Sequence, residues 1–375
     1  MAGIYIHIPF CKTRCIYCGF YSTTDAGLRS RYVDALLQEL ALRTDYLDEP
    51  VETIYLGGGT PSQLDTEDLQ RLLNGVGKSD ILKRFESSRV HEITIECNPD
   101  DVTLEYAHEL KALGVNRVSM GVQTFSDERL RFLRRRHTAQ QARQAVATLR
   151  QAGIENISID LMFGFPDETL SEWHSDIDEA LSLDVEHISA YSLMYEEGTP
   201  LHAMLERGNI REISDEQSST MYYTLIDRLT SAGYEHYEIS NFARPGRRSR
   251  HNSSYWTATP YLGLGAGAHS YDRQSRQWNV SNLRTYINKV EHGVVPFERE
   301  TLDETTKYND MITTALRTRE GLLIDDAGPL RDYLLHEARP LIERGLLNES
   351  AGRLRLTRRA LFVSDDVMSE LIFTD

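Results

Sequence analysis

The segment YIHIPFCKTRCIYC (residues 5–18) joins an apolar run to a loop that holds three of the four cysteines of the chain. The spacing C-x3-C-x2-C lets one loop direct three thiolates at a metal centre, here from Cys11, Cys15 and Cys18. A zinc site would need a fourth ligand, which His7 or Cys97 could supply. A cubane iron–sulfur cluster normally takes four thiolates, so with three of them one iron stays open for a small molecule. Three unrelated cysteines are the remaining interpretation.

The apolar run starts an alternation of strands and helices. Helical periods separate the predicted strands, which lie at 3–8, 51–56, 91–97, 116–122, 156–163 and 187–194. Most of these strands are continuously apolar, which is typical of strands buried on both faces of a parallel sheet. We therefore expect an α/β fold with a partial (β/α)6 barrel, because a full barrel has eight such units.

The pattern changes after about residue 240. NFARPGRRSRHNSSYW (241–256) is polar, basic and aromatic, and YLGLGAGAHSY (261–271) is rich in glycine. Helices follow, and then GLLNESAGRLRLT (345–357) predicts two short strands around a turn. We expect three parts: the barrel at 1–240, a connecting segment at 241–300, and a small C-terminal domain at 301–375 of helical or winged-helix-like type.

Composition narrows the class of protein. A formal net charge of −16 repels phosphate backbones, so we expect no nucleic-acid partner. No apolar stretch is long enough to span a membrane, and the start of the chain lacks the features of a secretion signal. Four cysteines are too few for a disulfide framework in 375 residues. These features predict a globular cytoplasmic protein, and none of them indicates an oligomeric state.

A glycine-rich loop, LGGGTP (56–61), follows directly on the second predicted strand. Glycines let the backbone approach a ligand closely, and free N–H groups in such a loop bind carboxylates. The loop lacks the spacing of a dinucleotide fingerprint. A tight turn without a ligand is the alternative for Gly58, Gly59 and Thr60.

Polar residues recur where the predicted strands end. Glu96 ends the third strand, Gln123 follows the fourth, and Asp160 lies in the fifth. Each has a structural alternative, such as a helix cap for Glu96. In barrels the carboxyl ends of the strands carry the chemistry, so these residues and the cysteine loop predict one shared site.

Taken together, the motifs resemble those of the radical S-adenosylmethionine (SAM) proteins, and within them the group of the oxygen-independent coproporphyrinogen III oxidase. The resemblance spans nearly the whole chain and depends on YIHIPFCKTRCIYC, GGGTPS, IECNPD, GVQTF, LRRRH, DLMFGFP and ALRTREGL. It implies a [4Fe–4S] cluster held by the three loop cysteines, with SAM on the open iron. The cofactor-binding residues that it implies are Tyr5, Tyr17, Gly58, Gly59, Thr60, Glu96, Gln123, Arg135, Asp160, Ala190 and His269. A solvated basic face is the alternative for Arg135, which lies within a run of three arginines.

Two features distinguish the chain from the oxidase. The oxidase branch has a further cysteine two residues after the third, where this chain has Phe20, and it carries an N-terminal extension. HNSSYW (251–256) is similar to the H-N-x-x-Y-W motif of the HemW-like heme chaperones. The resemblance therefore points to that sister branch.

Heme binding can also be argued from this motif. His251 could ligate heme iron, and Tyr255 and Trp256 could stack on a porphyrin. The neighbouring arginines could pair with heme propionates: Arg244, Arg247, Arg248 and Arg250. An ordinary exposed loop is the alternative for this segment.

The function that this resemblance implies is that of a heme chaperone, which binds heme and hands it to acceptor proteins. It would carry the cluster and SAM, and it would need an electron donor. SAM cleavage belongs to the chemistry of the family, but we do not expect a coproporphyrinogen oxidase. That oxidase, and a radical SAM enzyme with another substrate, are the alternatives.

Overall fold

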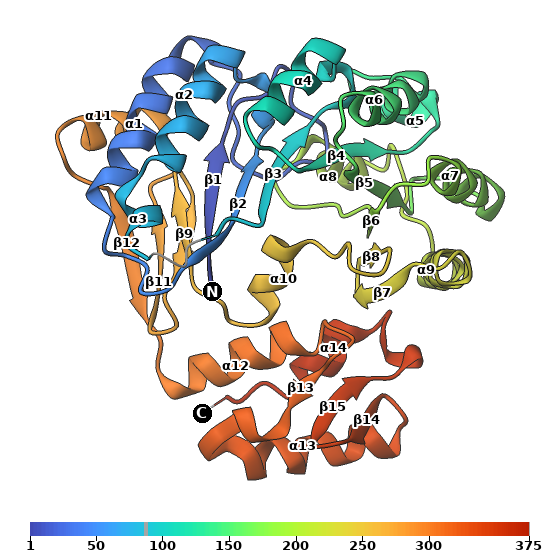
Figure 1. Cartoon of the computed structure of the whole chain (residues 1–375). Helices are drawn as coiled ribbons and strands as arrows, with labels where there is room; N and C mark the ends of the chain where they lie inside the picture. The colour runs from blue at the N-terminus through green and yellow to red at the C-terminus, as the bar shows by residue number, and fades with distance from the viewer. Residues whose placement is uncertain (86–88, 375) are drawn as a thin grey trace.

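A computed structural model describes residues 1–85 and 89–374. Its centre is a run of parallel strands in sequence order, so each strand pairs with the next (Figure 1). These strands are β1 (Ala2–Ile8), β2 (Val51–Gly58), β3 (Glu92–Cys97), β4 (Arg117–Gln123), β5 (Asn156–Phe163) and β6 (His187–Ser192). The order and the parallel pairing confirm the predicted partial (β/α)6 architecture, and within the described residues the sheet does not close into a barrel.

Helices follow each of these strands, and most of them cover one face of the sheet. They are α1 (Arg29–Leu42), α2 (Thr66–Gly77), α3 (Asp80–Lys83), α4 (Leu104–Ala112), α5 (Asp127–Phe132), α6 (Ala139–Gln151), α7 (Leu170–Ser182), α8 (Pro200–Glu206) and α9 (Asp215–Ser231). Helix α8 instead packs against the cysteine loop. Thr138 and Thr169 start α6 and α7 with capping boxes, which satisfy free N–H groups at both helix starts.

Strand alternation separates two chemically different faces. On the helix-covered face, five apolar side chains stand in register and are fully buried: Ile6, Leu56, Ile95, Val118 and Ile157. Each contributes about 1.5–3 kcal/mol by burial. The opposite, inner face carries polar residues at the alternate positions, including Tyr55, Thr94 and Arg117. The strands are therefore not uniformly apolar, because only their outward positions pack against helices.

The sheet extends beyond the parallel strands on both sides. The added elements are β7 (Glu235–Glu238), β8 (Asn241–Ala243), β9 (Tyr261–Leu264), β10 (His269–Tyr271), β11 (Ser275–Asn279) and β12 (Phe297–Thr301), together with α10 (Arg250–Trp256) and α11 (Leu283–Glu291). In the described residues the complete order is β12-β11-β10-β9-β1-β2-β3-β4-β5-β6-β8-β7. Residues 241–300, expected as a connecting segment, thus contribute strands to the main sheet.

The C-terminal part has a core of its own, which begins at Tyr308. Its elements are α12 (Glu304–Ala315), β13 (Leu322–Leu323), α13 (Arg331–Glu343), β14 (Leu347–Ser350), β15 (Arg353–Leu356) and α14 (Ser364–Ser369). The strands form an antiparallel sheet in the order β13-β15-β14. Short 3₁₀ helices of the chain lie at Ala26–Leu28, Pro61–Gln63, Pro99–Asp101, Ile324–Leu330 and Arg358–Ala360. Figure 1 shows α12 running below α10, on the side of the sheet where the strands begin.

Among the described helices, none combines the length and apolar character that crossing a membrane requires.

Candidate functional site

The cysteine loop follows β1 at the carboxyl end of the parallel strands. The loop closes on itself, because Cys11 N donates to Thr23 O (2.9 Å) and Thr23 N donates to Pro9 O (2.7 Å). Ile16 anchors its middle by packing into a small apolar cluster with Leu133 and Phe165. These contacts hold the segment between Cys11 and Cys18 over the strand ends.

The three sulfurs are half-buried, and polar groups from neighbouring loops face two of them. Thr60 Oγ1 lies 3.4 Å from Cys11 Sγ, and Arg135 Nη1 donates to Cys15 Sγ at 3.6 Å. Burial raises the pKa of the Cys18 thiol, and the neighbouring thiols raise it further. A cationic metal cluster would hold these sulfurs as thiolates, so the donor set fits the [4Fe–4S] group.

A zinc site does not form with the expected fourth ligands. His7 is engaged on both ring nitrogens, with Tyr5 Oη at 3.2 Å and Tyr21 O at 3.3 Å. Cys97 is buried in the main core. In the described part of the chain, no group of three or more His, Cys, Asp or Glu side chains is arranged to hold a metal ion.

The glycine loop lies beside the cysteine loop and leaves no room for side chains. A Cβ atom on Gly59 would lie 2.8 Å from the carbonyl carbon of Pro9. Gly58 has a φ of 108°, a left-handed value that favours glycine. Gly58 N donates to Glu96 Oε2 at 3.1 Å, and Tyr55 Oη donates to Glu96 Oε1 at 2.8 Å. Burial raises the pKa of Glu96 to about 7, although these two hydrogen bonds oppose the shift.

Arg135 reaches back from the loop after α5 to the same region. Its Nη2 donates to Asn98 Oδ1 and to Gly121 O, both at 2.5 Å. Its Nε is buried without a hydrogen-bond partner among the described residues. Gln123 ends β4 next to a register shift and has a φ of 69°. The solvated-face alternative for this arginine therefore does not hold.

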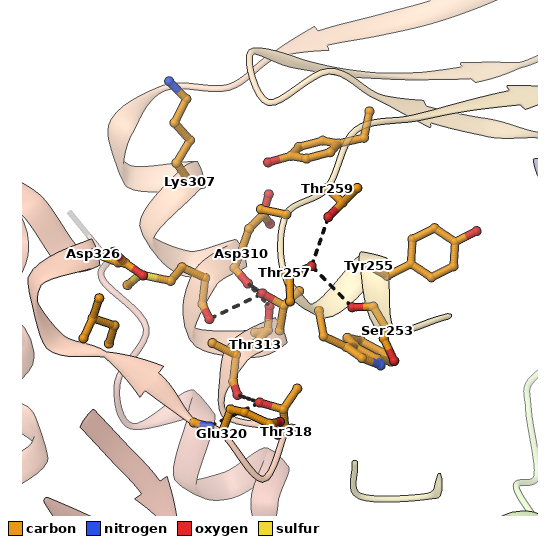
Figure 2. A pocket seen from close by; sticks show the side chains of 18 of the residues that line it. Ser253, Tyr255, Thr257, Thr259, Lys307, Asp310, Thr313, Thr318, Glu320 and Asp326 are labelled. Carbon is orange, nitrogen blue, oxygen red and sulfur yellow. Dashed lines mark hydrogen bonds between the residues drawn. The ribbon is translucent and has the colours of Figure 1, made fainter. Parts of the chain in front are cut away.

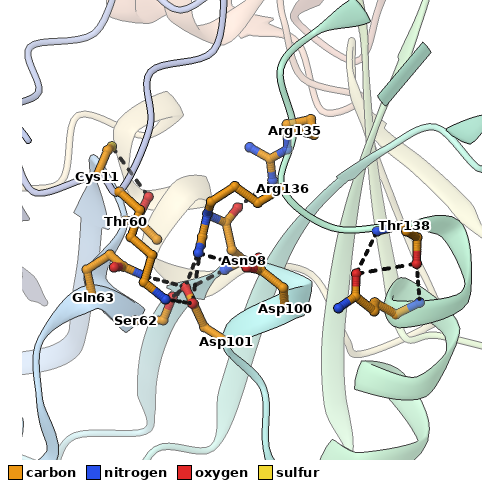
Figure 3. Close-up of polar contacts among 12 residues, drawn as sticks. Cys11, Thr60, Ser62, Gln63, Asn98, Asp100, Asp101, Arg135, Arg136 and Thr138 are labelled. Carbon is orange, nitrogen blue, oxygen red and sulfur yellow. Dashed lines mark hydrogen bonds and ion pairs between the residues drawn. The ribbon is translucent and has the colours of Figure 1, made fainter. Parts of the chain in front are cut away.

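The next arginine locks four loops together (Figure 3). Arg136 pairs with Asp100 at 2.7 Å and with Asp101 at 3.1 Å. Asp101 also accepts hydrogen bonds from Ser62 (2.8 Å), Gln63 (2.6 Å) and Lys12 (3.1 Å). These side chains come from the loops after β1, β2, β3 and β4, so the network holds the loops that surround the cysteines.

Asp160 lies on the inner face of β5, where burial raises its pKa to about 6 and hydrogen bonds from Ser189 and Ser119 oppose the shift. Arg117, also on the inner face, acts in the same direction as those hydrogen bonds. Its side chain is almost completely buried, and Nε and Nη1 have no hydrogen-bond partner among the described residues. The sequence reading missed Arg117. Alternate polar residues in the fourth predicted strand were the signal that would have placed it inward.

The other predicted cofactor residues lie on both sides of this region. Tyr5 stacks on Tyr55 with ring centroids 6.1 Å apart, on the inner face. Tyr17 belongs to the cysteine loop. Ala190 is buried on β6 and donates its N–H to Ser240 O at 2.8 Å, and His269 is exposed on β10 beside Trp278. The structure thus joins the cysteine, glycine and arginine loops closely, with Ala190 on the last parallel strand, β6, and His269 on the added strand β10.

Helix α10, which carries the H-N-x-x-Y-W motif, lies at the opposite end of the strands. The Glu92 carboxylate accepts the N–H groups of Arg250 and His251, both at 3.0 Å, at the helix start. The His251 ring bonds to Thr53 Oγ1 at 2.8 Å and to Tyr255 Oη at 2.9 Å. It exposes 0% of its surface, and burial lowers its pKa to about 3. This geometry does not support the prediction that His251 ligates heme iron, because both ring nitrogens are in use.

Two of the four arginines before and at the start of α10 are paired with carboxylates. Arg244 pairs with Asp184 at 2.9 Å, and Arg248 pairs with Glu320 at 2.8 Å. Arg247 is exposed on the loop, and Arg250 is exposed at the first position of α10. Arg248 lines a cavity with a volume of about 950 Å³ (Figure 2). It lies between α10 with its following loop and the C-terminal part, and Tyr255 and Trp256 also line it.

Comparison with known proteins supplies a family. A model of the radical SAM superfamily matches residues 5–180, and one of the HemN C-terminal domain matches residues 302–363. The chain is 36% identical to the heme chaperone HemW of Bacillus subtilis (strain 168) over 382 residues, with 99% of each chain covered. It is 34% identical to the heme chaperone HemW of Mycobacterium tuberculosis (strain ATCC 25618 / H37Rv) over 376 residues, covering 99% of this chain and 94% of that protein.

A solved structure agrees with the fold. Coproporphyrinogen III oxidase (HemN) from Escherichia coli superposes with a TM-score of 0.82 at 22% identity, covering 99% of this chain and 90% of that one. At this identity the likeness concerns the fold alone. The motif-based resemblance is confirmed by the relatives, which match at higher identity over the full length. The chain belongs to the HemW family of radical SAM proteins.

Proposed function

We propose that the chain is a heme chaperone: it binds heme and transfers it to acceptor proteins. The observation that carries this proposal is the full-length similarity to proteins named heme chaperone HemW, at 36% identity over 99% of both chains. The function follows the family rather than the fold, because one fold supports many activities.

We further propose that Cys11, Cys15 and Cys18 hold a [4Fe–4S] cluster, and that the open iron takes SAM. When bound, the reduced cluster supplies an electron that can split the sulfonium of SAM. The residues of the chain position and shield these groups. Gly58 and Gly59 present backbone at close range, and Arg135 supplies a positive charge beside Cys15. Both observations support binding of a carboxylate-bearing cofactor at this end.

The oxidase alternative is disfavoured by the loop itself. Phe20 stands where the oxidase branch has a cysteine, and its side chain is 72% exposed. A phenylalanine side chain has no thiol to contribute at that position. Radical decarboxylation of coproporphyrinogen therefore lacks one of the groups that the oxidase motif contains.

The role of a chaperone implies further partners. We propose an electron donor for the cluster and heme-acceptor proteins in the cytoplasm.

We also propose two domains with a boundary near residue 302, in place of a separate connecting segment at 241–300. Residues 241–301 add strands to the main sheet, and the second core starts at Tyr308.

Anaerobic reconstitution followed by two parallel assays tests the proposal. We expect the protein to bind hemin stoichiometrically, to pass it to an apo-hemoprotein such as apomyoglobin, and to leave coproporphyrinogen III unchanged in the presence of SAM and a low-potential reductant. Consumption of coproporphyrinogen, or failure to bind hemin, would overturn the proposal.

A further inference from the structure

We propose that the cavity between α10 and α12 is the heme seat, and that the C-terminal domain forms half of it. This inference rests on the proposed function and adds the location, the iron ligand and the carboxylate partners. At the amino ends of the strands, α10 and the buried His251 close the inner face of the sheet, and we call this closure the plug. The cavity lies on the outer side of the plug, at the opposite end of the strands from the cysteine loop. Heme and cluster would therefore occupy separate sites.

The cavity is large and has two chemically distinct walls. Its volume of about 950 Å³ lies near the upper limit of small-molecule sites, which hold roughly 300–1,000 Å³. Figure 2 shows Ser253, Thr257 and Thr259, from α10 and its loop, facing Lys307, Asp310 and Thr313 of α12. A ligand in this cavity would contact both the barrel and the C-terminal domain, and a large planar molecule could reach both walls.

A row of aromatic rings supplies an apolar surface for a porphyrin. Tyr255 and Tyr261 make an edge contact with ring centroids 4.8 Å apart, and Tyr261 lies 6.3 Å from Tyr271. Trp256 also lines the cavity, and the guanidinium carbon of Arg317 lies over its indole ring, 5.2 Å from the ring centroid. Aromatic surfaces favour flat conjugated ligands through stacking and edge contacts.

Polar atoms in the same wall have no partner within the protein as described. Trp256 Nε1 and Ser253 Oγ are buried, line the cavity region and make no hydrogen bond to the described residues. Buried donors normally find a partner, because an unsatisfied one costs about 1–3 kcal/mol. Both atoms are already covered by protein, so a ligand would reach them only after a shift of these side chains.

Cations near β11 and α12 match the two carboxylates of heme. The cavity is lined by Arg248, Arg276, Lys307 and Arg353 against Asp310, Glu320 and Asp326, a slightly positive lining in a chain of net charge −16. Lys307 contacts Glu304 at 3.3 Å in a partly exposed pair, so its ammonium can exchange partners at little cost. Arg276 pairs with Asp310 and with Glu300, both at 3.1 Å, so a propionate would share this guanidinium with them. We assign the propionates to Lys307 and Arg276.

Met311 is the iron ligand that this lining offers. The described lining contains no histidine or cysteine, and the Met311 thioether is a known type of heme ligand. The tyrosines are poorer ligands, because binding to iron requires the phenolate. Burial raises the pKa of Tyr261 to about 12 and also raises the pKa of Tyr271, and Tyr255 Oη already bonds to His251.

Hemin titrations of the full chain, followed by Soret absorbance, test the site. Thr314→Trp fills the cavity from α12, and Thr220→Trp places the same residue at an exposed position of α9. We expect at least tenfold weaker hemin binding in Thr314→Trp and unchanged binding in Thr220→Trp. Lys307→Glu should also weaken binding at least tenfold, whereas Lys289→Glu, an exposed charge reversal on α11, should not. Unchanged hemin affinity in Thr314→Trp and Lys307→Glu would overturn the proposed site while leaving the chaperone function intact.

Met311→Leu tests the ligand without removing the apolar wall. We expect the ferric heme spectrum to lose the signature of thioether ligation, while the cluster still reconstitutes as in the wild type. An identical spectrum in Met311→Leu would overturn this ligand assignment. A wild-type protein that bound no hemin would instead contradict the proposed function itself, so the two failures are distinguishable.

Discussion

The two ends of the strands handle polar groups in opposite ways. At the carboxyl ends, half-buried sulfurs, a glycine backbone and the Arg135 guanidinium share one open region. At the amino ends, α10 closes the inner face with hydrogen bonds that leave His251 without exposed surface. The sulfurs at the carboxyl ends stay partly exposed, whereas both ring nitrogens of His251 at the amino ends are already hydrogen-bonded. The second ligand site therefore belongs outside the plug, in the cavity facing the C-terminal domain.

Removing the sulfurs gives the largest expected effect. In Cys11→Ser/Cys15→Ser/Cys18→Ser, anaerobic reconstitution should incorporate essentially no iron or sulfide, against about four irons per chain in the wild type, because no other thiol faces the loop. Cys97→Ser is the matched control, since Cys97 is buried in the main core and should be dispensable for the cluster. Iron bound by the triple variant, or lost from Cys97→Ser, would contradict the assignment.

The next largest effect is expected from adding one methyl group to the glycine loop, which should weaken SAM binding without changing hemin binding. Gly59→Ala places Cβ 2.8 Å from the backbone of Pro9, so the glycine and cysteine loops must shift apart. SAM affinity, measured by calorimetry on the reconstituted protein, should fall at least tenfold while hemin affinity stays constant. Gly77→Ala meets nothing within 4 Å and should behave as the wild type. Equal SAM affinity in both variants would argue against a close backbone approach at Gly59.

At the carboxyl ends of the strands, Glu168 makes the free energy of unfolding depend on pH. This side chain is fully buried, accepts from Gly164 N and Phe165 N, and faces Arg129 and Asp176. Burial raises its pKa to about 7, above the unfolded value. Its contribution to stability is fully present below about pH 4.5 and is lost as the pH rises through 7, by roughly 3 kcal/mol. Urea unfolding at pH 5 and pH 8 should show a smaller loss of stability in Glu168→Gln than in the wild type; an equal loss would refute this account.

The plug should depend on Glu92. Glu92→Ala removes the carboxylate that accepts two N–H groups at the start of α10, and we expect a loss of about 1–3 kcal/mol in the free energy of unfolding. Glu128→Ala, at an exposed position of α5, should change stability by less than about 0.5 kcal/mol. SAM affinity should remain constant in both variants. A Glu92→Ala protein as stable as Glu128→Ala would show that α10 does not need this anchor.

The sequence predicted the parallel strands to within two residues, because each is a run of residues whose outward positions pack against helices. It also predicted the two strands around the turn at 345–357. The strands between 241 and 301 escaped prediction, since β8 (Asn241–Ala243) and β10 (His269–Tyr271) are short and gain their pairing from distant partners.

The placement of functional side chains follows the same rule: local sequence signals can be predicted, and contacts between distant segments cannot. The cysteine spacing and the glycine loop are local signals, so the carboxyl-end site could be predicted. Arg117 and Glu92 are not predicted from the sequence, because a mainly apolar strand gives no sign of its inward side chains unless the alternation at Glu92, Thr94 and Glu96 is followed. The cavity could not be predicted, because its walls lie on α10 and α12, which are far apart in the sequence. The burial of His251 depends equally on the distant Thr53.

The most direct test of two separate ends is a hemin titration of the Cys11→Ser/Cys15→Ser/Cys18→Ser protein beside Thr314→Trp, each also assayed for iron and sulfide after reconstitution. The account predicts that the triple variant binds hemin with wild-type affinity but holds no cluster, and that Thr314→Trp holds the cluster but binds hemin at least tenfold more weakly. Loss of hemin binding together with the cysteines, with wild-type hemin binding in Thr314→Trp, would contradict it.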